Sequence, residues 1–142
     1  MTAMAARKQT MEGGDPGADI VGDSPASVIP GMVDGGVAAW QEDGATDGKT
    51  QFGPGEYDAA MAAQITLFEE VVHGWDLALA SGQTLDVSSE VGDAVLEIAQ
   101  MLCNDEQRGE GKPFRTEVSV ADSASSLDKA LGLTGRDPNW SA

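Results

Sequence analysis

The alternation of apolar and polar positions is clearest between residues 56 and 82. The apolar residues of this stretch recur in alternating steps of four and three, which places them on one helical face: Met61, Ile65, Phe68, Val72, Trp75 and Leu79. Gly82 follows the pattern directly and can take the positive φ that commonly ends a helix. We therefore predict that residues 56–82 form the long spine helix of the fold.

Three shorter helices are predicted around the spine. Ser24 and Pro25 are typical of an N-cap and a first helical position, and the helix they begin extends to about Trp40, interrupted by Pro30-Gly31 and Gly35-Gly36. Ser88 caps a helix whose apolar face holds Val91, Val95, Ile98 and Leu102. Ser125 or Ser126 caps a last short helix through Leu133, which Gly135 stops.

The remaining segments are not strongly periodic. Residues 1–12 are predicted to form a short helix, and residues 41–55 a polar loop, because that stretch is rich in turn-forming residues. Residues 114–120 alternate as FRTEVSV and are predicted to be a short strand or an extended edge. The fold class is therefore mostly α, a single domain over residues 1–142 with a short C-terminal strand and a terminal helix.

Charge and composition exclude several classes of function. The chain carries 24 Asp and Glu against 8 Lys and Arg, a net charge of -16, which argues against binding to nucleic acid or to an anionic membrane. No apolar run is long enough for a signal peptide or a membrane span. With one Cys and one His, the chain has neither an intramolecular disulfide nor a multi-histidine metal cage.

Cys103 is unpaired, and a reducing cytoplasm is the expected compartment for such a chain. It stands near the end of an apolar helical pattern, so a buried, unreactive thiol is favoured over a reactive nucleophile. The three tryptophans, Trp40, Trp75 and Trp140, are too dispersed to predict a stacking platform, and Trp75 is predicted to belong to the core.

Chemically active side chains concentrate on the predicted spine helix. Glu69, His73 and Asp76 stand at i, i+4 and i+7 and form one stripe beside the apolar face. Glu69 and His73 could present two ligands to one divalent metal, or Glu69 could fix the ring tautomer of a general base. An ordinary surface Glu–His pair has the same spacing and is favoured on spacing alone. Asp76 is expected to bond to a neighbouring backbone group or to an Arg or Lys rather than to a metal.

These residues also carry a resemblance to a known family. LFEEVVHGWDLALASGQ at 67–83, with SSEVGDAVLEIAQML at 88–102, is similar to the second half of the actinobacterial mycothiol-dependent maleylpyruvate isomerase, metal-binding-domain family. That family belongs to the DinB-like four-helix bundles. The run from His73 to Ala78 is the most specific match, and Gly-Arg-Asp-Pro-x-Trp at 135–140 is a second. ADIVGDSPAS at 18–27 resembles the loop that leads into the family's second long helix.

The resemblance implies a helical bundle that holds a divalent metal, zinc being the expected ion, through three side chains. Glu69 and His73 match the acid and the His that the family places four residues apart. The family's first ligand, a His at the end of its opening helix, has no counterpart in this chain. The bundle is therefore expected to lack its opening helix, or the gene to begin further upstream. Asp76, an acid from a polar loop or a side chain of a second copy could supply the third ligand.

Two candidate functions follow from this resemblance and from the absence of the family's first ligand. In the first, the protein is a DinB-like metal-binding enzyme in which a divalent ion activates a thiol cofactor, mycothiol, for an isomerase or transferase reaction on a small-molecule substrate. In the second, it is a degenerate, non-catalytic helical protein that binds a ligand or partner. A bundle that lacks one helix leaves an apolar face uncovered, and such faces usually mark a partner surface. A homo-oligomer in which each copy covers the other is therefore expected.

Overall fold

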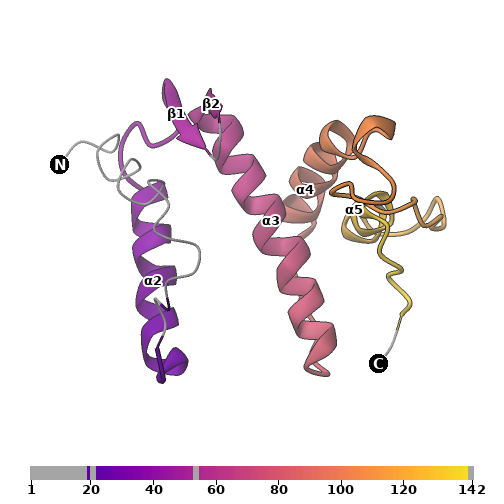
Figure 1. The fold of residues 1–142 in the computed structure, drawn as a ribbon, viewed down its shortest axis with the longest axis horizontal. Helices are drawn as coiled ribbons and strands as arrows, with labels where there is room; N and C mark the ends of the chain where they lie inside the picture. The colour runs from indigo at the N-terminus through magenta and orange to yellow at the C-terminus, as the bar shows by residue number, and fades with distance from the viewer. Residues whose placement is uncertain (1–18, 20–21, 53–54, 141–142) are drawn as a thin grey trace. The chain divides into compact units, whose positions relative to one another are not determined.

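A computed structural model describes residue 19, residues 22–52 and residues 55–140 of the 142-residue chain (Figure 1). Within these residues the α helices are α2 (Pro25–Trp40), α3 (Ala59–Ala80), α4 (Ser89–Leu102) and α5 (Ser126–Thr134). A short 3-10 helix, η1 (Asp105–Gln107), and a small antiparallel sheet of β1 (Lys49–Phe52) and β2 (Gly55–Asp58) accompany them. The mostly-α fold class is thus confirmed. The helix predicted over residues 1–12 lies outside the described residues.

The chain divides into two compact units, residues 1–63 and residues 64–142. The first unit contains α2, the two-stranded sheet and the start of α3. The second contains the rest of α3 together with α4, η1 and α5. The prediction of one domain over residues 1–142 stays a prediction.

In the first unit, α2 begins where the sequence predicts. Pro25 occupies the first helical position, and the carbonyl of Ser24 accepts hydrogen bonds from the backbone N–H groups of Ser27 and Val28 at 3.0 and 3.3 Å. The helix continues unbroken through Pro30-Gly31 and Gly35-Gly36, so the predicted interruptions are wrong. No residue of α2 is buried, and its large apolar side chains stand exposed: Ile29, Met32, Val33 and Val37.

The predicted loop over residues 41–55 is wrong for its last part, because Lys49–Phe52 pairs with Gly55–Asp58 as a hairpin. Lys49 lies directly opposite Asp58, an arrangement in which opposite charges stabilise a strand pair. The hairpin leads straight into α3, since the N–H of Ala59 donates to the carbonyl of Gly48 at 2.8 Å. The spine helix therefore begins at Ala59 rather than at residue 56. The loop was predicted because the segment is rich in turn-forming residues, but whether it forms a strand depends on the segment with which it pairs.

In the second unit, the predicted apolar face of α3 is the face that packs. Phe68 and Val72 are buried, and Trp75 and Leu79 are partly buried, whereas Leu77, which lies off this face, is 70% exposed. The ring of Phe68 contacts the edge of Phe114, with centroids 6.3 Å apart and planes at 77°. Gly82 ends the helix region with φ of +69°, as predicted.

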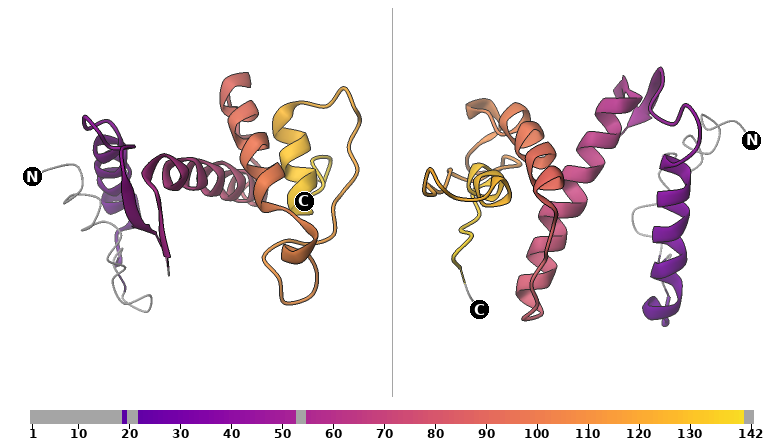
Figure 2. Two further views of the ribbon diagram at one scale, coloured as in Figure 1. Left: turned by 90° about the horizontal axis from the view of Figure 1, so that it is seen from above. Right: turned by 180° about the vertical axis from the view of Figure 1, so that it is seen from behind.

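Helices α4 and α5 lie side by side (Figures 1 and 2). Each begins with the serine cap that the sequence indicates: the side-chain oxygen of Ser88 accepts from the N–H of Val91 at 3.3 Å, and that of Ser125 accepts from the N–H of Asp128 at 3.1 Å. Their contact buries apolar side chains from both helices: Val95, Ile98, Ala99, Ala130 and Leu131. This packing is the core of the second unit.

Residues 114–120 form an extended segment, one of the two predicted alternatives, and do not form a strand of a sheet. Phe114 makes an isolated bridge with Arg108, and the N–H of Val118 donates to the carbonyl of Gly132 at 3.0 Å. The segment approaches α5 so closely that a Cβ on Gly132 would lie 2.5 Å from the carbonyl oxygen of Val118. Only glycine fits at this position, so this contact sets how the extended segment lies on α5.

Leu131 offers a direct test of this core. Leu131→Ala should lower the free energy of unfolding by about 2–5 kcal/mol, because Leu131 is 0% exposed and the deletion leaves a cavity between α4 and α5. The matched control Leu77→Ala, at a position 70% exposed, should change it by less than about 0.5 kcal/mol. Urea denaturation followed by circular dichroism measures both values. Equal losses in the two variants would contradict the assigned core.

Candidate functional site

The predicted stripe on α3 exists as a connected cluster centred on His73. Nε2 of His73 lies 3.1 Å from Oε2 of Glu69, and Nδ1 lies 3.1 Å from Oδ2 of Asp76. Both partners come from the same helix, at i−4 and i+3, where helical geometry brings side chains together. The imidazole is therefore held between two carboxylates. All three side chains remain accessible from solvent, with the His73 side chain 64% exposed.

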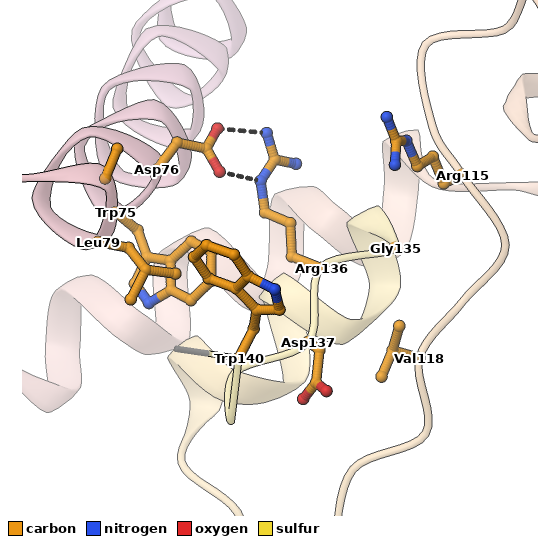
Figure 3. A pocket seen from close by; sticks show the side chains of 10 residues that line it. Trp75, Asp76, Leu79, Arg115, Val118, Gly135, Arg136, Asp137 and Trp140 are labelled. Atoms are coloured by element: carbon orange, nitrogen blue, oxygen red, sulfur yellow. Dashed lines mark hydrogen bonds and ion pairs between the residues drawn. The ribbon is translucent and has the colours of Figure 1, made fainter. Parts of the chain in front are cut away.

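Asp76 extends the cluster to a distant part of the chain. Its two carboxylate oxygens accept hydrogen bonds from Arg136, Nε donating to Oδ1 at 2.7 Å and Nη2 donating to Oδ2 at 2.6 Å (Figure 3). This two-pronged geometry is the strongest that a guanidinium forms with a carboxylate. Hydrogen bonding from Arg136 holds the pKa of Asp76 below its usual value, with a further contribution from His73. The expectation that Asp76 bonds to an Arg or Lys is confirmed.

Arg136 is placed by the way α5 ends. Gly135 follows the last helical residue in the left-handed conformation, with φ of +88°. The N–H of Gly135 then donates to the carbonyl of Gly132, and the N–H of Arg136 to the carbonyl of Leu131, both at 3.0 Å. This pair of bonds is the Schellman motif, which fixes the direction in which the chain leaves a helix. The Arg136 side chain, 23% exposed, is thereby aimed at α3.

The cluster fits part of a divalent metal site. Two ligands of one tetrahedral zinc ion lie about 3.3 Å apart, given metal–ligand bonds of about 2.0–2.1 Å. The 3.1 Å between Nε2 of His73 and Oε2 of Glu69 is close to that value. A carboxylate on the other ring nitrogen is the usual companion of a metal-ligating His, and Asp76 occupies that position. Glu69 and His73 are therefore spaced as two ligands of one ion would be, a distance that an ordinary ion pair shares.

Among the described residues, no third side chain completes this pair of candidate ligands. In the part of the chain that the structure describes, no group of three or more His, Cys, Asp or Glu side chains is arranged to hold a metal ion. Asp76 faces Nδ1, and the two ring nitrogens point in different directions, so an ion on Nε2 lies out of its reach. The geometry therefore assigns Asp76 a positioning role toward His73, and a three-ligand site needs a donor from elsewhere.

Cys103 takes no part in this cluster. It follows α4, is 6% exposed and forms no disulfide. Burial raises the pKa of its thiol to about 11, so the group stays protonated and unreactive near neutral pH. Its carbonyl accepts a hydrogen bond of 2.8 Å from Nη2 of Arg108. The prediction of a buried, inert thiol is borne out by this burial and this pKa.

Next to the cluster, the second unit contains a cavity of about 470 Å³ (Figure 3). Its lining comes from α3, from the extended segment and from the chain after α5: Trp75, Asp76, Leu79, Ala80, Arg115, Val118, Gly135, Arg136, Asp137 and Trp140. The sequence did not predict this grouping, because Trp75 and Trp140 lie 65 residues apart and the tryptophans were expected to be too dispersed for a stacking platform. The one signal was the Gly-Arg-Asp-Pro-x-Trp motif, which supplies four of the lining residues.

Comparisons with known proteins leave the family undetermined. The chain is 31% identical over 82 residues to "Uncharacterized protein Rv0738" and to "Uncharacterized protein MT0763", both from strains of Mycobacterium tuberculosis. The aligned region covers 58% of this chain and 45% of each relative, so the chain spans about half the length of the curated relatives it matches. No family model matches the chain. No solved structure matches it either.

None of the described helices is both long and apolar enough to cross a membrane.

The raised pKa of Cys103 predicts how stability depends on pH. Below pH 9 the thiol is protonated in both the folded and the unfolded chain, so its contribution is fully present. Between about pH 9 and pH 11 only the unfolded chain loses the proton, and the free energy of unfolding should fall by up to about 2 kcal/mol. Urea denaturation of the wild type and of Cys103→Ala across this range measures the difference. A difference that stays constant with pH would contradict the assigned burial.

Proposed function

We propose that this chain is a DinB-like metal-binding protein related to the mycothiol-dependent isomerases and transferases. The observation that supports this proposal is the placement of His73, which has Glu69 on Nε2 and Asp76 on Nδ1. An ordinary surface Glu–His pair needs only the first of these contacts. The second contact, made by a carboxylate that also binds Arg136, is one that a metal-ligating His commonly makes.

The residues of the chain divide the work as follows. Asp76 is ionised near neutral pH, and Arg136 lowers its pKa further. It therefore accepts the Nδ1 proton of His73, so that Nε2, the ring nitrogen beside Glu69, is the one that would bind a cation. Glu69 supplies a carboxylate oxygen on the same side of the ring. A divalent cation such as zinc, when held there, supplies Lewis acidity that lowers the pKa of a thiol, for which mycothiol is the proposed cofactor.

The third ligand of this proposed site comes from outside the described residues, from a second copy of the chain or from the substrate itself. The cytoplasm is the proposed compartment, because the free thiol of Cys103 persists in a reducing environment. The reaction is proposed to be an isomerisation or transfer on a small molecule.

Metal titration tests this proposal. Zinc added to chelator-treated wild type should bind at one equivalent per chain by isothermal titration calorimetry and elemental analysis. Glu69→Gln and His73→Gln should each weaken binding by more than about 100-fold, and Asp76→Asn by about 10–100-fold, because the first two lose a ligand and the third loses the group that orients His73. Glu70→Gln removes the same charge from an exposed neighbour on α3 and serves as the control.

Two results would overturn the metal proposal: no stoichiometric binding in the wild type after zinc or nickel loading, or equal binding in wild type, Glu69→Gln and His73→Gln. The thiol is tested separately on cobalt-loaded protein. Mycothiol should produce a near-ultraviolet charge-transfer band, and S-methylated mycothiol, which lacks the thiol, should not. A band with both compounds, or with neither, would remove mycothiol from the proposal.

One observation favours a second function, that of a non-catalytic helical protein that associates with itself. The apolar side chains of α2 at positions 29, 32, 33 and 37 are exposed, and their spacing puts them on one side of the helix. Exposed apolar surfaces of this kind commonly mark an interface. Self-association through α2 would also bring two copies of the chain together, and with them a source of further ligands.

Light scattering tests the self-association. The wild type should give a multiple of the chain mass of 14.6 kDa, and Val33→Lys should shift it toward the monomer, because a charge then enters the apolar face. Ala38→Lys adds the same charge to an exposed position on the other side of α2 and should leave the mass unchanged. A wild-type monomer with a cooperative thermal transition would sink this second function.

A further inference from the structure

Arg115 lines the cavity beside Asp76, and its guanidinium has no partner among the described residues. The guanidinium of Arg115 makes no hydrogen bond or ion pair with any described residue, whereas its backbone carbonyl accepts from Nη1 of Arg108 at 3.0 Å. Arg136 spends Nε and Nη2 on Asp76 and keeps Nη1, which points away from Asp76 toward the side where Arg115 lies (Figure 3). The cavity therefore presents several guanidinium N–H donors without a protein acceptor.

Neither acid that lines the cavity forms an ion pair with Arg115. Asp76 is balanced by Arg136 through two hydrogen bonds. Asp137 accepts from the backbone N–H of Asn139 at 2.9 Å, and its carboxylate points away from both guanidinium groups (Figure 3). In a chain of net charge -16, two of only four arginines line this one cavity. The two arginines and the two acids of the lining therefore balance, in a chain whose net charge is -16.

The rest of the wall is apolar and aromatic. Trp75 and Trp140 both line the cavity, together with Leu79 and Val118. Trp140 is 54% exposed, which leaves its surface available to a ligand. A volume of about 470 Å³ lies within the range of small-molecule sites, which combine apolar walls with a few placed polar groups.

We propose that this cavity binds a small aromatic carboxylate. The carboxylate lies on Arg115 and on Nη1 of Arg136, because the planar guanidinium matches a carboxylate with paired hydrogen bonds. The ring of the ligand packs against Trp140 and Trp75, where flat aromatic surfaces gain most. A singly charged carboxylate is preferred to a doubly charged phosphate, because the surrounding protein is strongly acidic. This site is separate from the metal proposed at Glu69 and His73 and does not require it.

Nuclear magnetic resonance of the metal-free protein with benzoate as the probe tests this site. Benzoate should shift the indole N–H signals of Trp75 and Trp140 and leave that of Trp40, which does not line the cavity, unchanged. Benzamide, the neutral analogue of the same shape, should bind at least about tenfold more weakly, a difference of about 1.4 kcal/mol. Single Trp→Phe variants assign the three signals.

Variants identify the groups that bind. Arg115→Gln should weaken benzoate at least about tenfold while leaving benzamide unchanged, and Arg115→Lys should lie between wild type and Arg115→Gln. Trp140→Leu should weaken both ligands. Lys112→Gln removes a charge from an exposed position outside the cavity and should change neither.

Three outcomes would overturn the proposal. The first is no shift with benzoate up to about 10 mM, beyond which binding is too weak to be specific. The second is equal affinity for benzoate and benzamide, which would remove the carboxylate from the recognition. The third is benzoate binding that Arg115→Gln and Lys112→Gln weaken equally, which would reduce it to general charge attraction. None of these outcomes bears on zinc binding by Glu69 and His73.

Discussion

The pairing of Asp76 with Arg136 is the interaction on which the rest of the second unit's chemistry depends. It joins the long helix to the segment after the last helix across 60 residues of sequence. One carboxylate serves two neighbours, since Oδ2 of Asp76 also accepts from Nδ1 of His73. The same ion pair forms part of the cavity wall. The candidate metal ligand and the candidate ligand pocket are therefore organised by a single salt bridge, and the Schellman motif that ends α5 sets its position.

The three arginines of the described residues, Arg108, Arg115 and Arg136, differ in their partners. Arg108 donates hydrogen bonds to the backbone carbonyls of Cys103 and Arg115, which ties the extended segment to the end of α4. Arg136 forms a salt bridge with Asp76. Arg115 alone of these three has a guanidinium without a partner among the described residues, and it faces a cavity lined by aromatic side chains. The division separates structural arginines from one that is available to a ligand.

The helical parts of the fold were predictable because their causes are local. Serine caps at Ser88 and Ser125 and glycine stops at Gly82 and Gly135 act within a few residues of themselves, and the structure bears all four out. The hairpin of residues 49–58 was not predictable in the same way, because each of its strands is short and depends on the other. The interruptions predicted in α2 overestimated the local penalties of proline and glycine, since the helix contains Pro30 in its interior and runs on without a break.

The sequence by itself determined the mostly-α class, the stripe of Glu69, His73 and Asp76, and the inert character expected of Cys103, because helical periodicity and composition are properties of neighbouring residues. Only the tertiary structure decided that Asp76 pairs with Arg136. It alone placed Trp75, Trp140 and Arg115 around one cavity. The contacts of Asp76 with Arg136 and around the cavity join residues distant in sequence, and they form only when α3, the extended segment and the end of α5 pack together.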